Sequence, residues 1–309
     1  MIITDKLKER FVRDCKVPIK LYAEPYFMER MELFNDYFGT LSNWELFKVA
    51  IFSYATEDDY FINYNNTKEA AINFIKENPA FIEFNNLDMN QYAIKNVGFS
   101  SHDIFHESNI GRKFASIDMR KANFSSMRHY NPQIFGGANT WEEFIGKFTS
   151  DPYIIKSKYI REVIMGNCNP KKHITYEKYL MDEVLTRFLE SGIDKKTIVY
   201  FGNDEIVIDI TDHENYLDII KSVVDTADIP LRIDPFVLKA VRNENDGNVM
   251  GYIRFMYDGT FDFKCFTNYT LPFVIRLLRN EAITENDLLF DFEGNIAKFV
   301  TTPKLTLIG

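Results

Sequence analysis

Two acidic positions far apart in the sequence have the surroundings that metal-dependent phosphoryl chemistry uses. Asp118 ends the short apolar run FASID, and Asp204 and Glu205 belong to the turn in IVYFGNDEIVIDI. A carboxylate at the end of an apolar strand is costly to bury without a partner, so we expect it to be exposed, hydrogen-bonded or bound to a metal. Hard divalent cations prefer such oxygen ligands. These three residues therefore predict a site for Mg²⁺ or Mn²⁺.

A pair of such ions would support nucleotidyl transfer. Mg²⁺ often uses one or two protein carboxylates and fills its other positions with water and substrate phosphates. Two ions can then activate an attacking hydroxyl and stabilise the leaving pyrophosphate. The alternative is an ordinary hairpin, because Gly202 and Asn203 supply the φ > 0 conformations of a tight turn and Asp is also a common turn residue.

The segments that precede the hairpin are predicted to be mostly helical. Residues 21–38 carry apolar positions near a 3.6-residue period, and residues 56–79 end on Asn-Pro, as helices often do. Residues 114–118 are then predicted to form a short strand. Thr140, with Glu143 three residues later, predicts a capping box at the start of another helix. A long amphipathic helix from about Lys171 to Leu189 leads to the hairpin.

The segments after the hairpin mix helices with strands. We expect a helix capped by Thr211 or Asp212, then a strand over residues 229–235. Asp258-Gly259 predicts a type I′ turn between two alternating strands. Residues 271–284 are predicted to be helical and residues 290–300 to form another hairpin. This order predicts an α+β fold rather than a wound parallel sheet.

Composition indicates a globular protein of a reducing compartment. The chain of 309 residues is 46% hydrophobic, enough to bury a substantial core. Its three cysteines, Cys15, Cys168 and Cys265, form neither a disulfide framework nor a CxxC pair, so we expect a cytoplasmic location. The N-terminus is charged within its first six residues and no run of about 18 apolar residues occurs. We therefore expect neither a signal peptide nor a membrane span.

The charge of the chain is unevenly distributed. A formal net charge of -9 argues against a generic nucleic-acid binder, because phosphate contacts depend mainly on Lys and Arg. Residues 111–200, however, contain 15 Lys and Arg against 10 Asp and Glu, a balance of +5, whereas the remainder carries 21 against 35, or -14. The middle third is therefore cationic, although a solvated helix surface is an equally good explanation. Richness in Phe, Ile, Asn, Lys and Tyr is typical of AT-rich genomes, including those of viruses and phages.

Three segments resemble, in order, the motifs of reverse transcriptases. Residues 118–125, DMRKANFS, are similar to motif A, in which a strand-end Asp is followed at fixed spacing by Ala, an aromatic residue, Phe and Ser. Residues 166–170, GNCNP, resemble motif B, a Gly-rich turn containing Pro before a helix. Residues 202–205, GNDE, fall where these enzymes carry Tyr-x-Asp-Asp and where viral RNA polymerases carry Gly-Asp-Asp. Residues 212–266 occupy the places of motifs D and E.

The resemblance implies a palm-type nucleotidyltransferase that binds nucleic acid and nucleoside triphosphates. It implies that Asp118 and Asp204 are catalytic metal ligands and that Glu205 replaces the second Asp of the hairpin. Asn123 would stand where the family places a residue beside the sugar 2′ position, and a small amide there would tolerate ribonucleotides. Gly166 and Asn167 would contact template or nucleotide. The basic candidates for nucleotide and nucleic-acid contacts, from motif A or from charge and neighbourhood, are Arg120, Lys121, Lys158, Arg161, Lys171 and Lys172.

The resemblance also predicts how the chain is divided. Residues 1–110 would be a mostly helical, fingers-like region, and residues 111–266 a palm-like antiparallel sheet with helices on one face. Residues 267–309 would be a small α/β extension, which does not resemble a helical thumb.

Two alternatives remain open, because the second hairpin Asp, the usual Gln or Ser pattern of motif B and a basic fingers motif are absent. One is a catalytically inactive, palm-derived viral or phage protein that binds a protein partner in the host cytoplasm. The other is an unrelated α+β fold with chance matches. His102 and His106 have helical metal-ligand spacing, but two histidines without a Cys cluster are too few for a zinc site.

Overall fold

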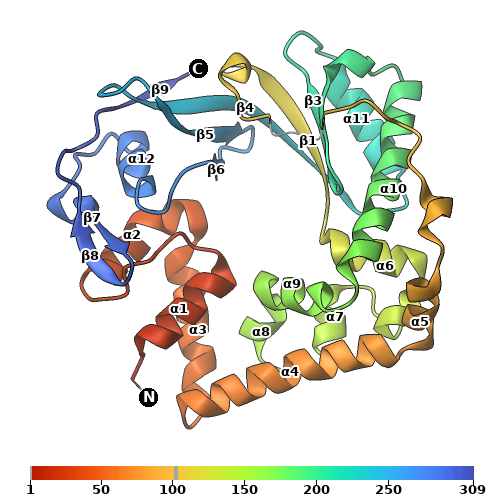
Figure 1. The fold of residues 1–309 in the computed structure, drawn as a ribbon, viewed down its shortest axis with the longest axis horizontal. Coiled ribbons are helices and arrows are strands. Elements are labelled where there is room, and N and C mark those ends of the chain that lie inside the picture. The colour runs from red at the N-terminus through yellow and green to blue at the C-terminus, as the bar shows by residue number, and fades with distance from the viewer. Residues whose placement is uncertain (1, 101–103) are drawn as a thin grey trace.

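The computed structural model describes residues 2–100 and 104–309, and Figure 1 shows how their elements are arranged. His102 lies outside the described residues. The chain before the sheet is mainly helical, as predicted, and α4 runs along one side of the molecule from the first three helices to α5. These elements are α1 (Asp5–Cys15), α2 (Tyr26–Phe38), α3 (Thr40–Phe52), α4 (Glu57–Glu77), α5 (Pro79–Asn86) and the 3₁₀ turns η1 (Met89–Tyr92) and η2 (Glu107–Asn109).

Local sequence explains where these helices begin and which face they bury. The side chain of Thr4 caps α1, and Thr56 with Asp59 closes a capping box at α4. On α2, Phe27, Met31 and Phe34 are fully buried, in agreement with the 3.6-residue period of the apolar positions. The N-terminal helices therefore pack around the apolar side chains whose spacing in the sequence places them on one face of each helix.

The centre of the fold is an antiparallel sheet with the strand order β2-β3-β1-β4-β5-β6. An additional strand, β9, pairs with the end of β4, and β7 pairs with β8 in a separate hairpin. The strands are β1 (Lys113–Met119), β2 (Ile198–Phe201), β3 (Glu205–Asp209), β4 (Leu231–Asn243), β5 (Val249–Met256), β6 (Phe261–Lys264), β7 (Leu289–Phe292), β8 (Asn295–Lys298) and β9 (Leu305–Ile308).

The remaining helices follow or separate the strands. They are α6 (Ala122–Tyr130), α7 (Trp141–Ile145), α8 (Pro152–Lys156), α9 (Lys158–Gly166), α10 (Pro170–Glu190), α11 (Tyr216–Asp225) and α12 (Leu271–Leu278), with the 3₁₀ turns η3 (Pro132–Phe135), η4 (Lys195–Thr197) and η5 (Glu285–Leu288). The α+β class, the helical N-terminal region and the antiparallel sheet are confirmed. Among the described residues no helix combines the length and apolar character that crossing a membrane would require.

The two faces of the sheet have different surroundings. On one face, Ile117 and Ile206 are fully buried in the core that also contains residues of α10 and α11. On the other face, Phe114 and Val207 pack in a smaller cluster with Ile104. Because successive residues of a strand point to opposite faces, Ser116 lies on the same face as Phe114, and Asp118 follows near the end of β1, where the chain turns into α6. The helices therefore support the sheet from one side, as predicted.

Two predictions about helix starts are wrong. Thr140 caps α7, but the carboxylate of Glu143 accepts a hydrogen bond from the amide of Asn139, so the predicted capping box does not close. Neither Thr211 nor Asp212 caps α11, which begins at Tyr216. The hydroxyl of Thr211 instead bonds to Asp209 and accepts from the amide of Lys113, which holds this segment beside the start of β1. Side chains that could cap a helix are thus used by competing partners.

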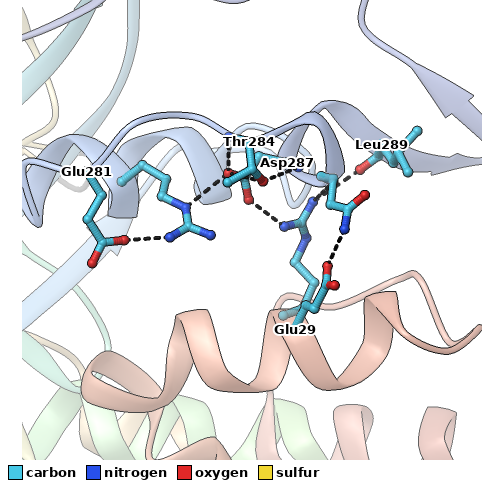
Figure 2. Close-up of polar contacts among 8 residues, drawn as sticks. Glu29, Glu281, Thr284, Asp287 and Leu289 are labelled. Carbon is cyan, nitrogen blue, oxygen red and sulfur yellow. Dashed lines mark hydrogen bonds and ion pairs between the residues drawn. The ribbon is translucent and has the colours of Figure 1, made fainter.

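A buried ion network fastens the C-terminal segment to α2 (Figure 2). Asp287 is 1% exposed and accepts hydrogen bonds from Arg30 of α2 at 2.8 Å and from Arg276 of α12 at 3.0 Å. Beside it, Asn286 donates to Glu29 at 2.7 Å. We call these residues the clasp. It joins α2 to a segment more than two hundred positions later in the sequence.

Candidate functional site

The sheet brings the two predicted acidic segments together. Strand β1 pairs with β3 in antiparallel register, so that Asp118 lies opposite Glu205. The amide of Met119 donates to the carbonyl oxygen of Asp204 at 2.8 Å, and the turn is closed by a 2.8 Å bond from Gly202 N to Glu205 O. Residues separated by 86 positions in the sequence are therefore neighbours at one end of the sheet.

A cavity of about 390 Å³ lies beside these two segments. Of the site residues predicted from the sequence, those that line it are Asp118, Lys121, Asn123, Lys158, Arg161 and Asp204. Strand β1 and the start of α6 supply one side, α9 and α10 supply the others, and the β2–β3 turn completes it. The structure thus gathers the two predicted carboxylates, three cationic side chains and an amide around one space, which Glu162 and Glu177 also line.

The two carboxylates are short of positive charge. Burial raises the pKa of Asp118 to about 6; the charge of Arg232 opposes this shift, and those of Asp204 and Glu205 add to it. Burial, together with the neighbouring charge of Glu205, also raises the pKa of Asp204. Arg232 approaches Asp118 only to 3.4 Å and is shared with Asp234. A divalent cation would relieve this repulsion, so the donor set fits one.

The number of carboxylates suits Mg²⁺ or Mn²⁺ rather than zinc. Within the part of the chain that the structure describes, no group of three or more His, Cys, Asp or Glu side chains is arranged to hold a metal. A zinc site needs three or four protein ligands, whereas Mg²⁺ can be bound by one or two carboxylates with water and substrate phosphates. Asp118 and Asp204 fit the second description.

The cationic side chains around the cavity differ in how far they are already paired. Lys121 is held by both oxygens of Glu142, at 2.7 and 2.6 Å. Lys158 is exposed and lies 3.9 Å from Glu162. Burial lowers the pKa of Arg161, and its buried Nε has no hydrogen-bond partner among the described residues. Arg161 is therefore the cation best placed to gain from an anionic ligand.

Glu205 lies opposite Asp118 in the sheet and already has partners of its own. Its carboxylate accepts a hydrogen bond from Ser116 and forms a 3.0 Å ion pair with Arg254 of β5. It lines another cavity, with Tyr200, Val207 and Arg254, on the face of the sheet opposite the helices. These contacts supply the positive charge and the hydrogen bond that the carboxylate needs, and the metal-binding role of Glu205 stays a prediction.

The other predicted residues do not line the cavity with Asp118 and Asp204. The side-chain amide of Asn167 donates to the carbonyl oxygen of Val163 on its own helix. The ammonium group of Lys172 bonds to the carbonyl oxygen of Leu87. The remaining members of this group, all exposed, are Arg120, Gly166 and Lys171. Their proposed contacts with nucleotide or nucleic acid stay predictions.

Two buried side chains of α10 in the cavity wall were missed by sequence reasoning. The Nδ1 of His173 lies 2.9 Å from the carboxylate of Glu177, and Ser126 contacts the same carboxylate at 3.4 Å. Each of the two α10 residues is 5% exposed. Their i, i+4 spacing places them on one face of a helix, and this was the available signal.

Comparison of the chain with protein-family models, with curated proteins and with solved structures finds no match. Function is therefore inferred from the geometry of the site and from the ordered motifs.

Proposed function

We propose that the chain is a divergent palm-type nucleotidyltransferase that depends on Mg²⁺ or Mn²⁺ held by Asp118 and Asp204. One observation carries the proposal: the two carboxylates that the motifs single out line the same cavity as Lys158 and Arg161. The antiparallel pairing of β1 with the β2–β3 hairpin supports it, because the strand and the turn of the motifs are neighbours.

The residues around the cavity suit a nucleoside triphosphate. Asp118 and Asp204 would hold the cation, which when bound supplies charge stabilisation to the reacting phosphate oxygens. Arg161 and Lys158 would bind the phosphates, as guanidinium and ammonium groups commonly do. The amide of Asn123 lines the same cavity from α6 and would lie beside the sugar. The substrates that this arrangement supports are nucleoside triphosphates and a nucleic-acid primer with its template.

We further propose that the protein works in the cytoplasm. Cys15, Cys168 and Cys265 are free thiols, and free thiols persist in a reducing compartment.

Extension of a labelled primer by the purified protein tests the proposal. Wild type should extend RNA or DNA primers, or add untemplated nucleotides, with NTPs or dNTPs in Mg²⁺ or Mn²⁺. Asp118→Asn and Asp204→Asn should abolish extension, whereas Asp225→Asn, at an exposed position on α11, should not. Equal inactivity of wild type and of the Asp118→Asn/Asp204→Asn protein on every template would remove the enzyme proposal.

A protein-binding role without catalysis is the second candidate. Apolar side chains are exposed on α3 and α4, among them Val49 at 72%, Phe52 at 52% and Ile62 at 57%. Val49 and Phe52 lie three residues apart on α3 and are therefore neighbours on its surface, and exposed apolar groups that lie together are typical of interaction surfaces. If this candidate holds, Phe52→Asp should disrupt a stoichiometric complex with a host protein, and Asp118→Asn should leave that complex intact.

A further inference from the structure

The ammonium group of Lys178 contacts the hairpin that carries Asp204 in three ways. Its Nζ donates to the carbonyl oxygens of Phe201 at 2.7 Å and of Gly202 at 2.8 Å. It also lies 3.1 Å from the centroid of the Phe201 ring, within the range of a cation–π contact. Lys178 belongs to α10, so these contacts join a helix to the tip of the hairpin.

The two carbonyl groups lie where the ladder between β2 and β3 stops. The last pair of that ladder is Phe201 with Ile206, and beyond it Gly202 N closes the turn on Glu205 O. Backbone carbonyl groups that leave a ladder need other partners if water does not reach them. A charged donor forms stronger hydrogen bonds than a neutral one. Lys178 therefore supplies partners where the strands no longer do.

The environment of Lys178 increases the strength of these contacts. Burial lowers the pKa of Lys178 to about 8, and the nearby charge of Asp182 opposes this shift. Hydrogen bonds of a charged group are stronger where water is partly excluded. The lysine is thus a partly desolvated support for the turn rather than a freely moving surface cation.

The same helix forms a wall of the candidate site. His173, Ile174 and Glu177, which lie one to five residues before Lys178 on the same helix, line the cavity with Asp118 and Asp204. Helix α10 has 21 residues and is anchored by buried side chains along its length. A single continuous helix therefore contacts both the cavity and the turn.

We propose that Lys178 is a positioning residue that fixes the turn carrying Asp204 relative to α10 and to Asp118. The effect on the turn stands on the contacts alone. Its consequence for metal binding rests on the proposed function.

Hydrogen exchange and metal affinity test the role of Lys178. The variants are Lys178→Met, Lys178→Arg and, should Lys178→Met fail to fold, Lys178→Gln. Arg187→Met is the matched control, because Arg187 lies on the same helix and donates to the carbonyl oxygen of Thr226, away from the hairpin. Exchange is read over residues 198–209, and Mn²⁺ affinity is measured by calorimetry or by electron paramagnetic resonance.

We expect Lys178→Met to increase exchange over residues 198–209 and to weaken Mn²⁺ binding about tenfold, as loss of an outer contact of a metal site does. Lys178→Arg should keep exchange and Mn²⁺ affinity near those of wild type, since its guanidinium can also donate to two carbonyl oxygens. Arg187→Met should change neither exchange over residues 198–209 nor Mn²⁺ affinity. Unchanged exchange in Lys178→Met, or an equal increase in Arg187→Met, would overturn the inference. If wild type binds no Mn²⁺, the proposed function fails, and the exchange result still decides the role of Lys178.

Discussion

At the scale of single residues, the charge of Asp118 is a cost to the folded protein. Its pKa of about 6 lies above the 3.8 of an unperturbed Asp, so the folded state binds this proton more tightly than the unfolded state does. The cost is therefore present above about pH 6 and disappears as the pH falls below about 4. An acidic group held at a loss of stability is typical of a functional site rather than of a structural one.

Asp118→Asn should therefore stabilise the protein at neutral pH. We expect the free energy of unfolding of Asp118→Asn to exceed that of wild type by about 1–3 kcal/mol at about pH 7.5, and this difference should shrink as the pH is lowered towards about 4. Arg232 keeps Asp234 as a partner, so its charge is not left unpaired. Urea denaturation across this pH range measures the effect. Mn²⁺ should raise the stability of wild type and not that of the variant, because a ligand stabilises only a state that binds it.

Glu205→Gln should behave in the opposite way. Arg254 is largely buried and would lose the charge of its partner, so we expect a loss of about 1–3 kcal/mol in the free energy of unfolding. Mn²⁺ binding and primer extension should remain near those of wild type. Abolition of Mn²⁺ binding, with a fold intact by circular dichroism, would show that Glu205 is a ligand after all.

At the scale of elements, the sheet depends on a glycine that the sequence alone does not mark as special. A Cβ on Gly251 of β5 would lie 2.6 Å from Cδ1 and 2.7 Å from Cγ of the Phe266 ring. This ring packs with the partly buried apolar side chains around the main core. The close contact is between residues of different segments, so no local pattern predicts it.

Gly251→Ala should destabilise the sheet, because the Phe266 ring must move. We expect the free energy of unfolding to fall by about 1–3 kcal/mol, as it does at other positions where a side chain is added to a well-packed core. Gly166→Ala is the control: nothing lies within 4 Å of the added Cβ at the end of α9, so its effect should be neutral or slightly stabilising. Chemical denaturation of both variants checks this. A fall in nucleotide binding by Gly166→Ala would instead support the contact that the motif implies for that position.

Sequence patterns predicted the elements whose signals are local. The hairpin at Asp258-Gly259 forms, but only Gly259, at φ +86°, has positive φ there, so its turn is not the predicted type I′. The last hairpin turns at Glu293-Gly294, where both residues have positive φ. Strand β9 was not predicted, since four residues carry too little alternation to be distinguished from a loop. The start of α11 was wrong because Thr211 bonds to a distant strand.

The site was predictable only where its residues carry a local signal in the sequence. Asp118 and Asp204 each carry a local signal, the end of an apolar strand and a turn, and the structure places both at one cavity. The ion pair of Glu205 with Arg254 depends on β4 lying between β1 and β5, which the sequence does not show. Spatial order of strands is thus the information that local patterns lack.

At the scale of the whole molecule, the clasp holds together segments from both ends of the sequence. Arg30 and Asp287 are both buried, and Arg276 is a second cation on the same carboxylate (Figure 2). Removing one partner of a buried pair leaves an uncompensated charge, which is far more costly than breaking a surface pair.

Asp287→Asn should therefore be strongly destabilising, by about 3–5 kcal/mol. Asp36→Asn is the matched control, because Asp36 pairs with Arg279 at 2.6 Å but is 66% exposed, and such pairs contribute about 0–1 kcal/mol. Thermal unfolding of both variants tests the difference, and limited proteolysis shows whether residues 267–309 detach first. Equal changes in thermal stability for Asp287→Asn and Asp36→Asn would mean that burial of the clasp contributes little to the stability of the fold.

The pairing of β4 also has a consequence for synthesis on the ribosome. Along one edge, β4 pairs first with β1, through residues 231–237, and then with β9, through residues 240–243. The strand that carries Asp118 and the strand over residues 305–308 thus share a single neighbour. During translation the end of β4 stays without this partner from the time residue 243 leaves the exit tunnel until residues 305–308 follow, and over this interval the nascent chain carries an unpaired strand edge that another chain can bind.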